Sequence, residues 1–172
     1  MTRFLLTLSA AAAATTSAAV SVAIAQPTPE AVGTFRDWIV YKADVDGDTI
    51  CYAVTEPKEK EPGSVNHGNV FFMVSTWKSG VAKAQPSFMS GYNLRERPEP
   101  IVRIGSDKWD MFSSGVEGFV DADRDEQRLV AAMRRGSEMR LSAMSERGTA
   151  TEYTFSLYGI SNALDRAERS CR

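Results

Sequence analysis

The stretch that decides the fold is EMRLSAMSERGTATEYTFSL, residues 138–157. Apolar residues alternate with polar ones on both sides of a short polar segment, at Met139, Leu141, Ala143, Tyr153, Phe155 and Leu157. Alternation of this kind is typical of half-buried strands, because successive side chains of a strand point to opposite faces of the sheet. The sequence therefore predicts a β-hairpin over these residues.

The parity of the two strands selects the turn between them. A two-residue loop at Arg147-Gly148 would place Ala143 opposite Glu152 and mix the two faces. A three-residue loop at 146–148 restores matching faces, with the pairs Met139–Phe155, Leu141–Tyr153 and Ala143–Thr151. Loops of this length usually end on a left-handed residue, so we predict a positive φ at Gly148. Turn geometry gives Arg147 no role, and we expect it either to anchor neighbouring carbonyls or carboxylates or to serve a partner.

The first 25 residues have the pattern of a signal peptide. A short basic start ends at Arg3, residues 4–24 are apolar and free of acids, and Ala23-Ile24-Ala25 is a cleavage signal. We expect cleavage between Ala25 and Gln26, leaving one mature domain over residues 26–172. The alternative is an uncleaved membrane anchor, but the run is rich in Ala, Ser and Thr rather than Leu and Ile.

Charge and hydropathy exclude two further classes for the mature chain. The whole chain has a formal charge of −2, and loss of Arg3 with the signal brings it to −3. Basic residues are interleaved with acids, so no nucleic-acid partner is expected. No second stretch is long and apolar enough to span a membrane.

Cys51 and Cys171 are the only two cysteines. An exported chain meets an oxidising compartment, which favours a disulfide between them. The alternative, a catalytic thiol, would need a nearby histidine, and His67 is the only one in the chain.

Short strands separated by turn signals fill most of the chain before the hairpin. The predicted strands are residues 34–43, 49–55, 69–77, 87–92, 101–104, 108–112 and 116–120. The continuous apolar run at 70–74 predicts a strand covered on both faces. Residues 56–68 read as a solvated polar loop, and His67 at its end is expected on the surface or at a strand edge.

Two helices are expected late in the chain. Asp123 is the predicted cap of the first, with Glu126 at capping-box spacing, and Gly136 ends it. Ser161 is the predicted cap of the second, whose apolar face carries Cys171 toward the sheet. Together these elements predict a mainly β fold, an antiparallel sandwich or barrel with one or two short helices near the C-terminus.

The sequence contains none of the common catalytic and metal-binding patterns. The acidic segments 44–48 and 121–125 lack the glycine and glutamate that a calcium-binding EF-hand loop requires. No nucleotide-binding, nucleophile-elbow or zinc-protease motif is present. We therefore predict no catalytic residue, metal ligand or cofactor; an acid-only hydrolase and a metal-dependent binder are the less favoured alternatives.

The order and spacing of several short markers resemble the invasion-associated locus B family of exported bacterial proteins. The markers are Phe35-x-x-Trp38, Cys51-Tyr52, Val70–Val74, Gly91-Tyr92, Leu129-Val130-x-Ala132-Met133-x-x-Gly136-Ser137, Ser145-x-Arg147-Gly148-Thr149, Tyr153-x-x-Ser156-Leu157-x-Gly159 and Cys171. The resemblance covers nearly the whole mature chain. Two departures are Phe119, where the family often has Trp, and the absence of a basic residue before Val70.

The resemblance implies an immunoglobulin-like sandwich in the periplasm or on the cell surface. It brings no catalytic residue set, and it links some members to host-cell invasion. The expected function is therefore non-enzymatic binding of a host-surface protein or of a component of the bacterial envelope. An envelope-stress or chaperone-like periplasmic factor is the alternative.

Overall fold

The computed structural model describes residues 28–172. The expected signal peptide and its cleavage site at Ala25-Gln26 therefore lie outside the described residues. Within them, the chain forms two antiparallel sheets and two helices. The prediction of a mainly β, sandwich-like antiparallel fold with short helices late in the chain is confirmed.

The two sheets differ in size and share the core between them. The larger has seven strands in the order β1 (Glu30–Phe35), β2 (Trp38–Val45), β3 (Asp48–Thr55), β5 (Phe71–Trp77), β6 (Gln85–Met89), β10 (Glu117–Phe119) and β9 (Phe112–Ser114). The smaller has five strands in the order β4 (Glu59–Glu61), β12 (Ala150–Ser156), β11 (Glu138–Met144), β7 (Ile101–Ile104) and β8 (Asp107–Asp110).

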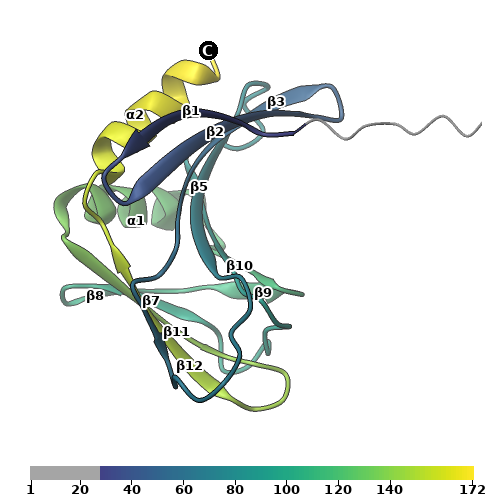
Figure 1. Ribbon diagram of the computed structural model, residues 1–172, viewed down its shortest axis with the longest axis vertical. Helices are drawn as coiled ribbons and strands as arrows, with labels where there is room; N and C mark the ends of the chain where they lie inside the picture. The colour runs from purple at the N-terminus through teal and green to yellow at the C-terminus, as the bar shows by residue number, and fades with distance from the viewer. Residues whose placement is uncertain (1–27) are drawn as a thin grey trace, which may run out of the picture.

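The helices cover the core at the end where the sheets diverge (Figure 1). Helix α2 (Ile160–Ser170) packs on β1, β2 and β3, and helix α1 (Asp123–Arg135) contacts α2 and β6. Each helix buries an apolar stripe, which includes Leu129 and Met133 in α1 and Ile160 and Leu164 in α2. This stripe is what an amphipathic helix on a sheet requires.

The β11–β12 hairpin has the predicted register. Met139 lies opposite Phe155, and the pairing continues through to Ala143 opposite Thr151. The turn is closed by the Gly148 N–H, which donates to the Ser145 carbonyl over 2.8 Å. Gly148 has φ +87°, as the three-residue loop requires.

A disulfide joins β3 to the end of α2. Cys51 and Cys171 are bonded, with their Cα atoms 5.8 Å apart and 120 residues between them in sequence. Both cysteines are buried. The predicted pairing is therefore confirmed, and so is the prediction that α2 directs Cys171 toward the sheet.

Several predicted boundaries are wrong. Residues 34–43 do not form one strand: the chain reverses at Arg36-Asp37, so that Phe35 pairs with Trp38 across a tight turn. The loop 56–68 contains the short strand β4, which pairs with β12. Strand β9 was not predicted. The strands expected at 87–92, 108–112 and 116–120 are shorter than expected or displaced.

Neither predicted helix cap is present. The N-cap of α1 is Ala122, and no side chain caps the helix. Asp123 is instead the first helical residue, where its charge favours the positive end of the helix dipole. Helix α2 starts one residue before Ser161, after Gly159 in a left-handed conformation with φ +95°. The Ser161 hydroxyl donates to the Arg134 carbonyl and so joins the two helices.

Candidate functional site

The seven-stranded sheet carries apolar side chains on the face turned away from the core. In β5, Phe72 and Val74 point inward and are buried, whereas Phe71 and Met73 point outward and remain partly exposed. The prediction that this strand is covered on both faces is therefore wrong. No other layer of the described residues covers this outer face.

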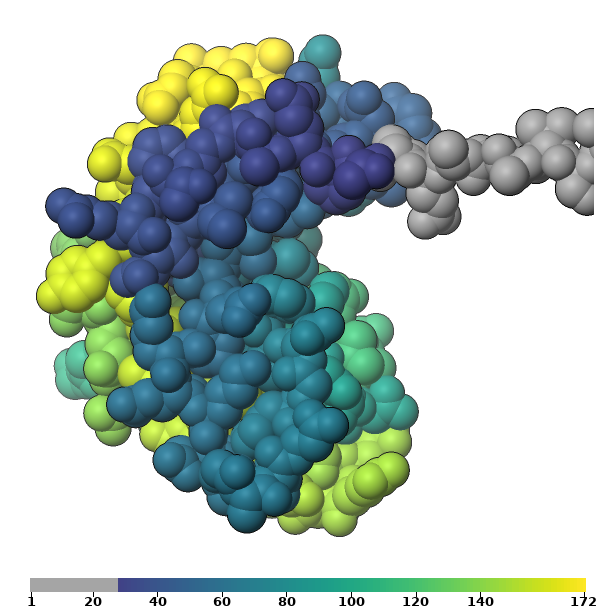
Figure 2. All heavy atoms as spheres, in the orientation of Figure 1, coloured from purple at the N-terminus to yellow at the C-terminus, as the bar shows by residue number. Residues whose placement is uncertain are grey.

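The outer face forms an apolar groove of about 660 Å³. Its apolar lining comes from four neighbouring strands and consists of Ile39, Tyr41, Tyr52, Val54, Phe71, Met73 and Met89. The register explains the continuity, because Ile39, Val54 and Met73 lie side by side across β2, β3 and β5. In the space-filling view, β1 and β2 form the upper part of the visible face, and the segment after β3 forms the lower part (Figure 2).

Two tyrosines form one end of the groove. Tyr41 and Tyr52 are cross-strand partners, and their rings stack with centroids 5.6 Å apart. Burial raises the pKa of Tyr52, with a smaller contribution from Tyr41. At neutral pH the Tyr52 hydroxyl therefore keeps its proton and can donate a hydrogen bond.

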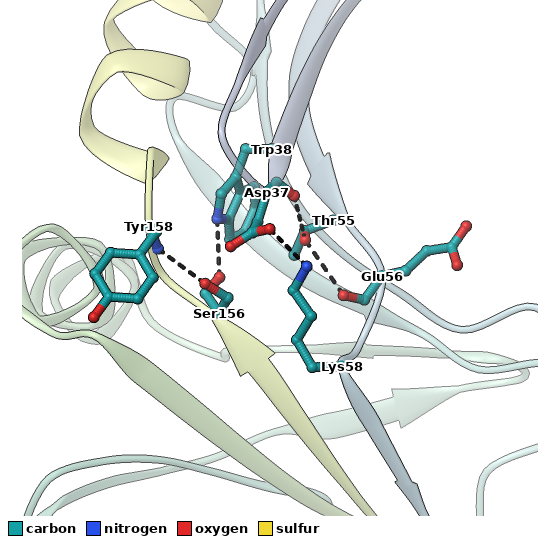
Figure 3. Close-up of polar contacts among 7 residues, drawn as sticks. All are labelled: Asp37, Trp38, Thr55, Glu56, Lys58, Ser156 and Tyr158. Atoms are coloured by element: carbon teal, nitrogen blue, oxygen red, sulfur yellow. Dashed lines mark hydrogen bonds and ion pairs between the residues drawn. The ribbon is translucent and has the colours of Figure 1, made fainter.

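The opposite rim is held by polar contacts, one of which joins the two sheets (Figure 3). The Trp38 indole N–H donates to the Ser156 carbonyl over 3.0 Å, and the Thr55 hydroxyl donates to the Asp37 carbonyl over 2.6 Å. Lys58 Nζ lies 2.6 Å from the Asp37 carboxylate. These contacts fix the β1–β2 turn against β12 and the segment before β4.

Asp37 is the charged group whose environment is most altered at this rim. The hydrogen bond from Lys58, together with one from the Ser156 hydroxyl, holds the pKa of the Asp37 carboxyl below its ordinary value. Charge-assisted hydrogen bonds favour the ionised form in this way. The groove therefore has an apolar floor and a rim that carries both charges at neutral pH.

A second, polar pocket of about 580 Å³ lies at the other end of the smaller sheet. It is lined by the loop before β5, the loop after β6 and the β11–β12 turn, and its members include His67, Tyr92, Asn93, Glu146, Arg147 and Thr151. Arg147, which was expected either to anchor neighbouring groups or to serve a partner, thus lies at a pocket, and another arginine holds the turn. Arg95 takes that role by donating to the Glu146 carbonyl over 3.0 Å.

His67 is buried, which contradicts the prediction of a surface or strand-edge histidine. Its side chain is 6% exposed, and its Nδ1 lies 2.9 Å from the Tyr153 hydroxyl. The Tyr153 hydroxyl lies 2.8 Å from that of Tyr92, which is 2.6 Å from the Thr151 hydroxyl. Burial is the main reason that the pKa of Tyr153 is raised.

Sequence reasoning missed both the groove and the His67 network. A strand with apolar residues at every position fits two arrangements: both of its faces are buried, or one face is buried and the other forms an apolar surface. The run at 70–74 was therefore the sequence signal that could have indicated the groove. The His67 partner Tyr153 lies 86 residues away. No local pattern reports such a contact.

None of the helices in residues 28–172 is long and apolar enough to cross a membrane. In the same part of the chain, no group of three His, Cys, Asp or Glu side chains is placed to hold a metal ion.

Comparison of the chain with family models, with curated proteins and with solved structures finds no match to any of the three.

Proposed function

We propose that this chain is an exported, non-enzymatic binding protein of the invasion-associated locus B type, and that its groove holds an apolar segment of another protein. The observation that carries the proposal is the apolar outer face of the seven-stranded sheet. Monomeric soluble proteins rarely expose a contiguous apolar patch without using it.

The composition of the groove favours a polypeptide as the ligand. Tyrosine and methionine are enriched at protein-binding surfaces, and the groove contains Tyr41, Tyr52, Met73 and Met89. The tyrosine hydroxyls offer hydrogen bonds at one end, and Lys58 and Asp37 offer charges at the other. A partner segment with apolar side chains and polar ends would match this arrangement.

The partner is expected in the bacterial envelope or on a host surface. The signal pattern of residues 1–25 supports export. The buried disulfide supports an oxidising compartment, because such bonds persist in the periplasm and outside the cell. We take an envelope protein as the first candidate partner, since every exported molecule meets the envelope first.

A photo-crosslinker tests the groove directly. A benzoyl-phenylalanine at position 71 places the reactive ring in the groove, and the same residue at position 158 is the control, because Tyr158 is well exposed and lies outside the groove. We expect irradiation of exporting cells to give one defined protein adduct from position 71, and Met73→Lys to remove it. Equal adducts from both positions, or none from position 71, would overturn the proposal.

A chaperone-like envelope factor is the second candidate, and Met73 and Met89 favour it. Methionine is flexible and adapts to differently shaped apolar partners. In that case position 71 would give many adducts rather than one. The purified protein would also slow the aggregation of an unfolded exported protein, and Met73→Lys would weaken this effect.

A further inference from the structure

A continuous chain of hydrogen-bonded groups crosses the interior beside the polar pocket. It runs from the Pro62 carbonyl through both ring nitrogens of His67, then through the Tyr153, Tyr92 and Thr151 hydroxyls. Its contacts measure 3.1, 2.9, 2.8 and 2.6 Å in that order. The Thr151 hydroxyl lies 3.2 Å from the Ala143 carbonyl, which ends the chain.

Both ends of this chain are acceptors. A carbonyl oxygen cannot donate, so the His67 Nε2 must carry a hydrogen in order to bond Pro62. In a neutral imidazole the Nδ1 is then bare and can only accept. The Tyr153 hydroxyl donates to it, Tyr92 donates to Tyr153, and Thr151 donates to Tyr92.

With neutral His67, the chain has one hydrogen fewer than it has contacts. Five contacts join the groups between the two carbonyls. Neutral His67 supplies one hydrogen and the three hydroxyls supply three, so one contact has none. A second proton on the imidazole raises the supply to five. Each hydroxyl then turns toward the next group, and Thr151 donates to Ala143.

We propose that His67 is a proton-operated switch, in which protonation in mild acid fills every contact of the chain and stiffens the polar pocket. The same histidine sits where two loops cross at contact distance. A side chain at Gly91 would have its Cβ 2.3 Å from the His67 carbonyl and 2.6 Å from the Gly68 Cα. Tyr92 directly follows Gly91, so the hydrogen-bonded chain from His67 through Tyr153 to Tyr92 ties together the two loops that form one wall of the pocket. This switch does not depend on the function of the apolar groove.

The charged groups around His67 are of both signs. Glu146 and Arg147 line the same pocket from the β11–β12 turn. On β4, Lys60 Nζ lies 3.5 Å from the Gly68 carbonyl, and the Glu61 carboxylate accepts from the Gly63 N–H. None of the ion pairs in residues 28–172 includes His67. The hydroxyl chain, rather than a carboxylate, is thus the group that receives the added proton's hydrogen bond.

Protonated His67 supplies the hydrogen that the fifth contact lacks, so the wild type should gain stability in mild acid relative to a variant whose chain is already balanced. This contribution to stability is present at low pH and is lost as the pH rises. Histidine changes charge between about pH 5 and pH 8, and His67 is the only one in the chain.

Thr151→Val is the decisive variant. Valine has nearly the shape of threonine but removes the last two contacts, leaving three contacts and three hydrogens with neutral His67. We expect that lowering the pH from about 8 to about 5 raises the wild-type folding equilibrium constant roughly tenfold relative to Thr151→Val. Tyr92→Phe also leaves three contacts and three hydrogens with neutral His67, so it should show the same pH dependence as Thr151→Val.

Nitrogen NMR of the single histidine completes the test. We expect the Nε2–H tautomer near pH 8, and in mild acid a hydrogen on Nδ1 that exchanges more slowly in the wild type than in either variant. Equal pH dependence of unfolding in wild type and both variants would overturn the switch. An Nδ1–H tautomer near pH 8 would overturn the count on which it rests.

Discussion

Two loops cross at Gly68 and Gly91 with their backbones in contact. No side chain fits at Gly91, because its Cβ would lie 2.3 Å from the His67 carbonyl. The need for glycine here is set by a neighbouring backbone rather than by local conformation. A backbone cannot move aside as the end of a flexible side chain can.

Gly91→Ala should therefore destabilise the fold by ~3 kcal/mol, because the two loops must separate. Gly63→Ala is the matched control: Gly63 lies in one of the two loops, and its added Cβ would meet nothing within 4 Å. Urea unfolding of both variants measures the difference. Equal stabilities would show that the crossing can relax without loss.

Gly148→Ala should cost about 1–2 kcal/mol, since φ is +87° and an alanine is strained in the left-handed region. Thermal unfolding measures the loss. Arg147→Ala, one residue earlier, should leave the midpoint unchanged, because Arg95 and not Arg147 donates to the turn. A change in partner binding at an unchanged midpoint would give Arg147 a role in recognition.

At this scale, parity predicted Gly148 correctly because the information lies within one hairpin. Mismatched faces excluded the shorter loop and left one position for the left-handed residue. His67 could not be placed in the same way. Its surroundings in sequence are polar, and its burial depends on Tyr92 and Tyr153, which reach it from other elements.

Among the elements, the segment between β3 and β5 links the two sheets. It leaves the larger sheet at Thr55, and its β4 pairs with the smaller sheet at β12. The Lys58 N–H donates to the Thr154 carbonyl over 2.7 Å, and its side chain pairs with Asp37. The segment thus closes the rim of the groove on the side where the sheets meet.

Asp37→Asn should lower the unfolding free energy by less than about 1 kcal/mol at neutral pH, as is usual for a partly exposed ion pair. The pKa of Asp37 is lowered in the folded chain. Its contribution is therefore present above the ordinary pKa of an aspartate and is lost as the pH falls through the lowered value. Wild type and Asp37→Asn should thus converge in stability in strong acid.

Urea unfolding across this acid range measures the convergence. Glu56→Gln serves as a control, because Glu56 also lines the groove and has no ion pair among those of the described residues. It should keep a constant difference from the wild type. A constant difference for Asp37→Asn as well would show that the Lys58 contact does not hold in solution.

Element types were easier to predict than element ends. The apolar stripe of α1 identifies a helix, but Asp123 suits both a cap and the first helical position, and the structure uses it as the latter. The sequence predicts one strand where β1 and β2 are separate, because the apolar residues Phe35 and Trp38 flank the turn and hide it. Strand β4 is charged throughout, and only its pairing with β12 defines it as a strand.

For the whole molecule, the disulfide is the contact with the widest reach. It closes a loop of 120 residues, and in the loop-entropy model a bridge of this span contributes up to about 5 kcal/mol. Replacing Cys51 and Cys171 together by alanine should lower stability by roughly 2–5 kcal/mol. Denaturant unfolding of the double variant, compared with reduced wild type, checks this value, and a loss well below that range would contradict it.

The assembly of two sheets followed from strand count and turn spacing, which is why the fold class was predictable. The sequence did not predict which faces of the two sheets would be covered by another layer. Burial of one sheet face requires knowledge of every layer that packs on it, and helices α1 and α2 occupy only the inner side of the larger sheet. The groove exists because no helix or strand of residues 28–172 packs on the outer side of the larger sheet.

The link between Cys51 and Cys171 also decides how the molecule responds to force. A pull between β1 and the last residue passes through β1, β2 and the first part of β3, then leaves through the sulfur bridge. Everything from residue 52 to residue 170, including the polar pocket, lies in a closed covalent ring that the pull cannot extend while the bridge is intact. The turn that carries Asp37 lies on the covalently loaded path, whereas the residues of the His67 chain lie within the ring, so stretching would extend the rim of the groove before it could unravel the polar pocket.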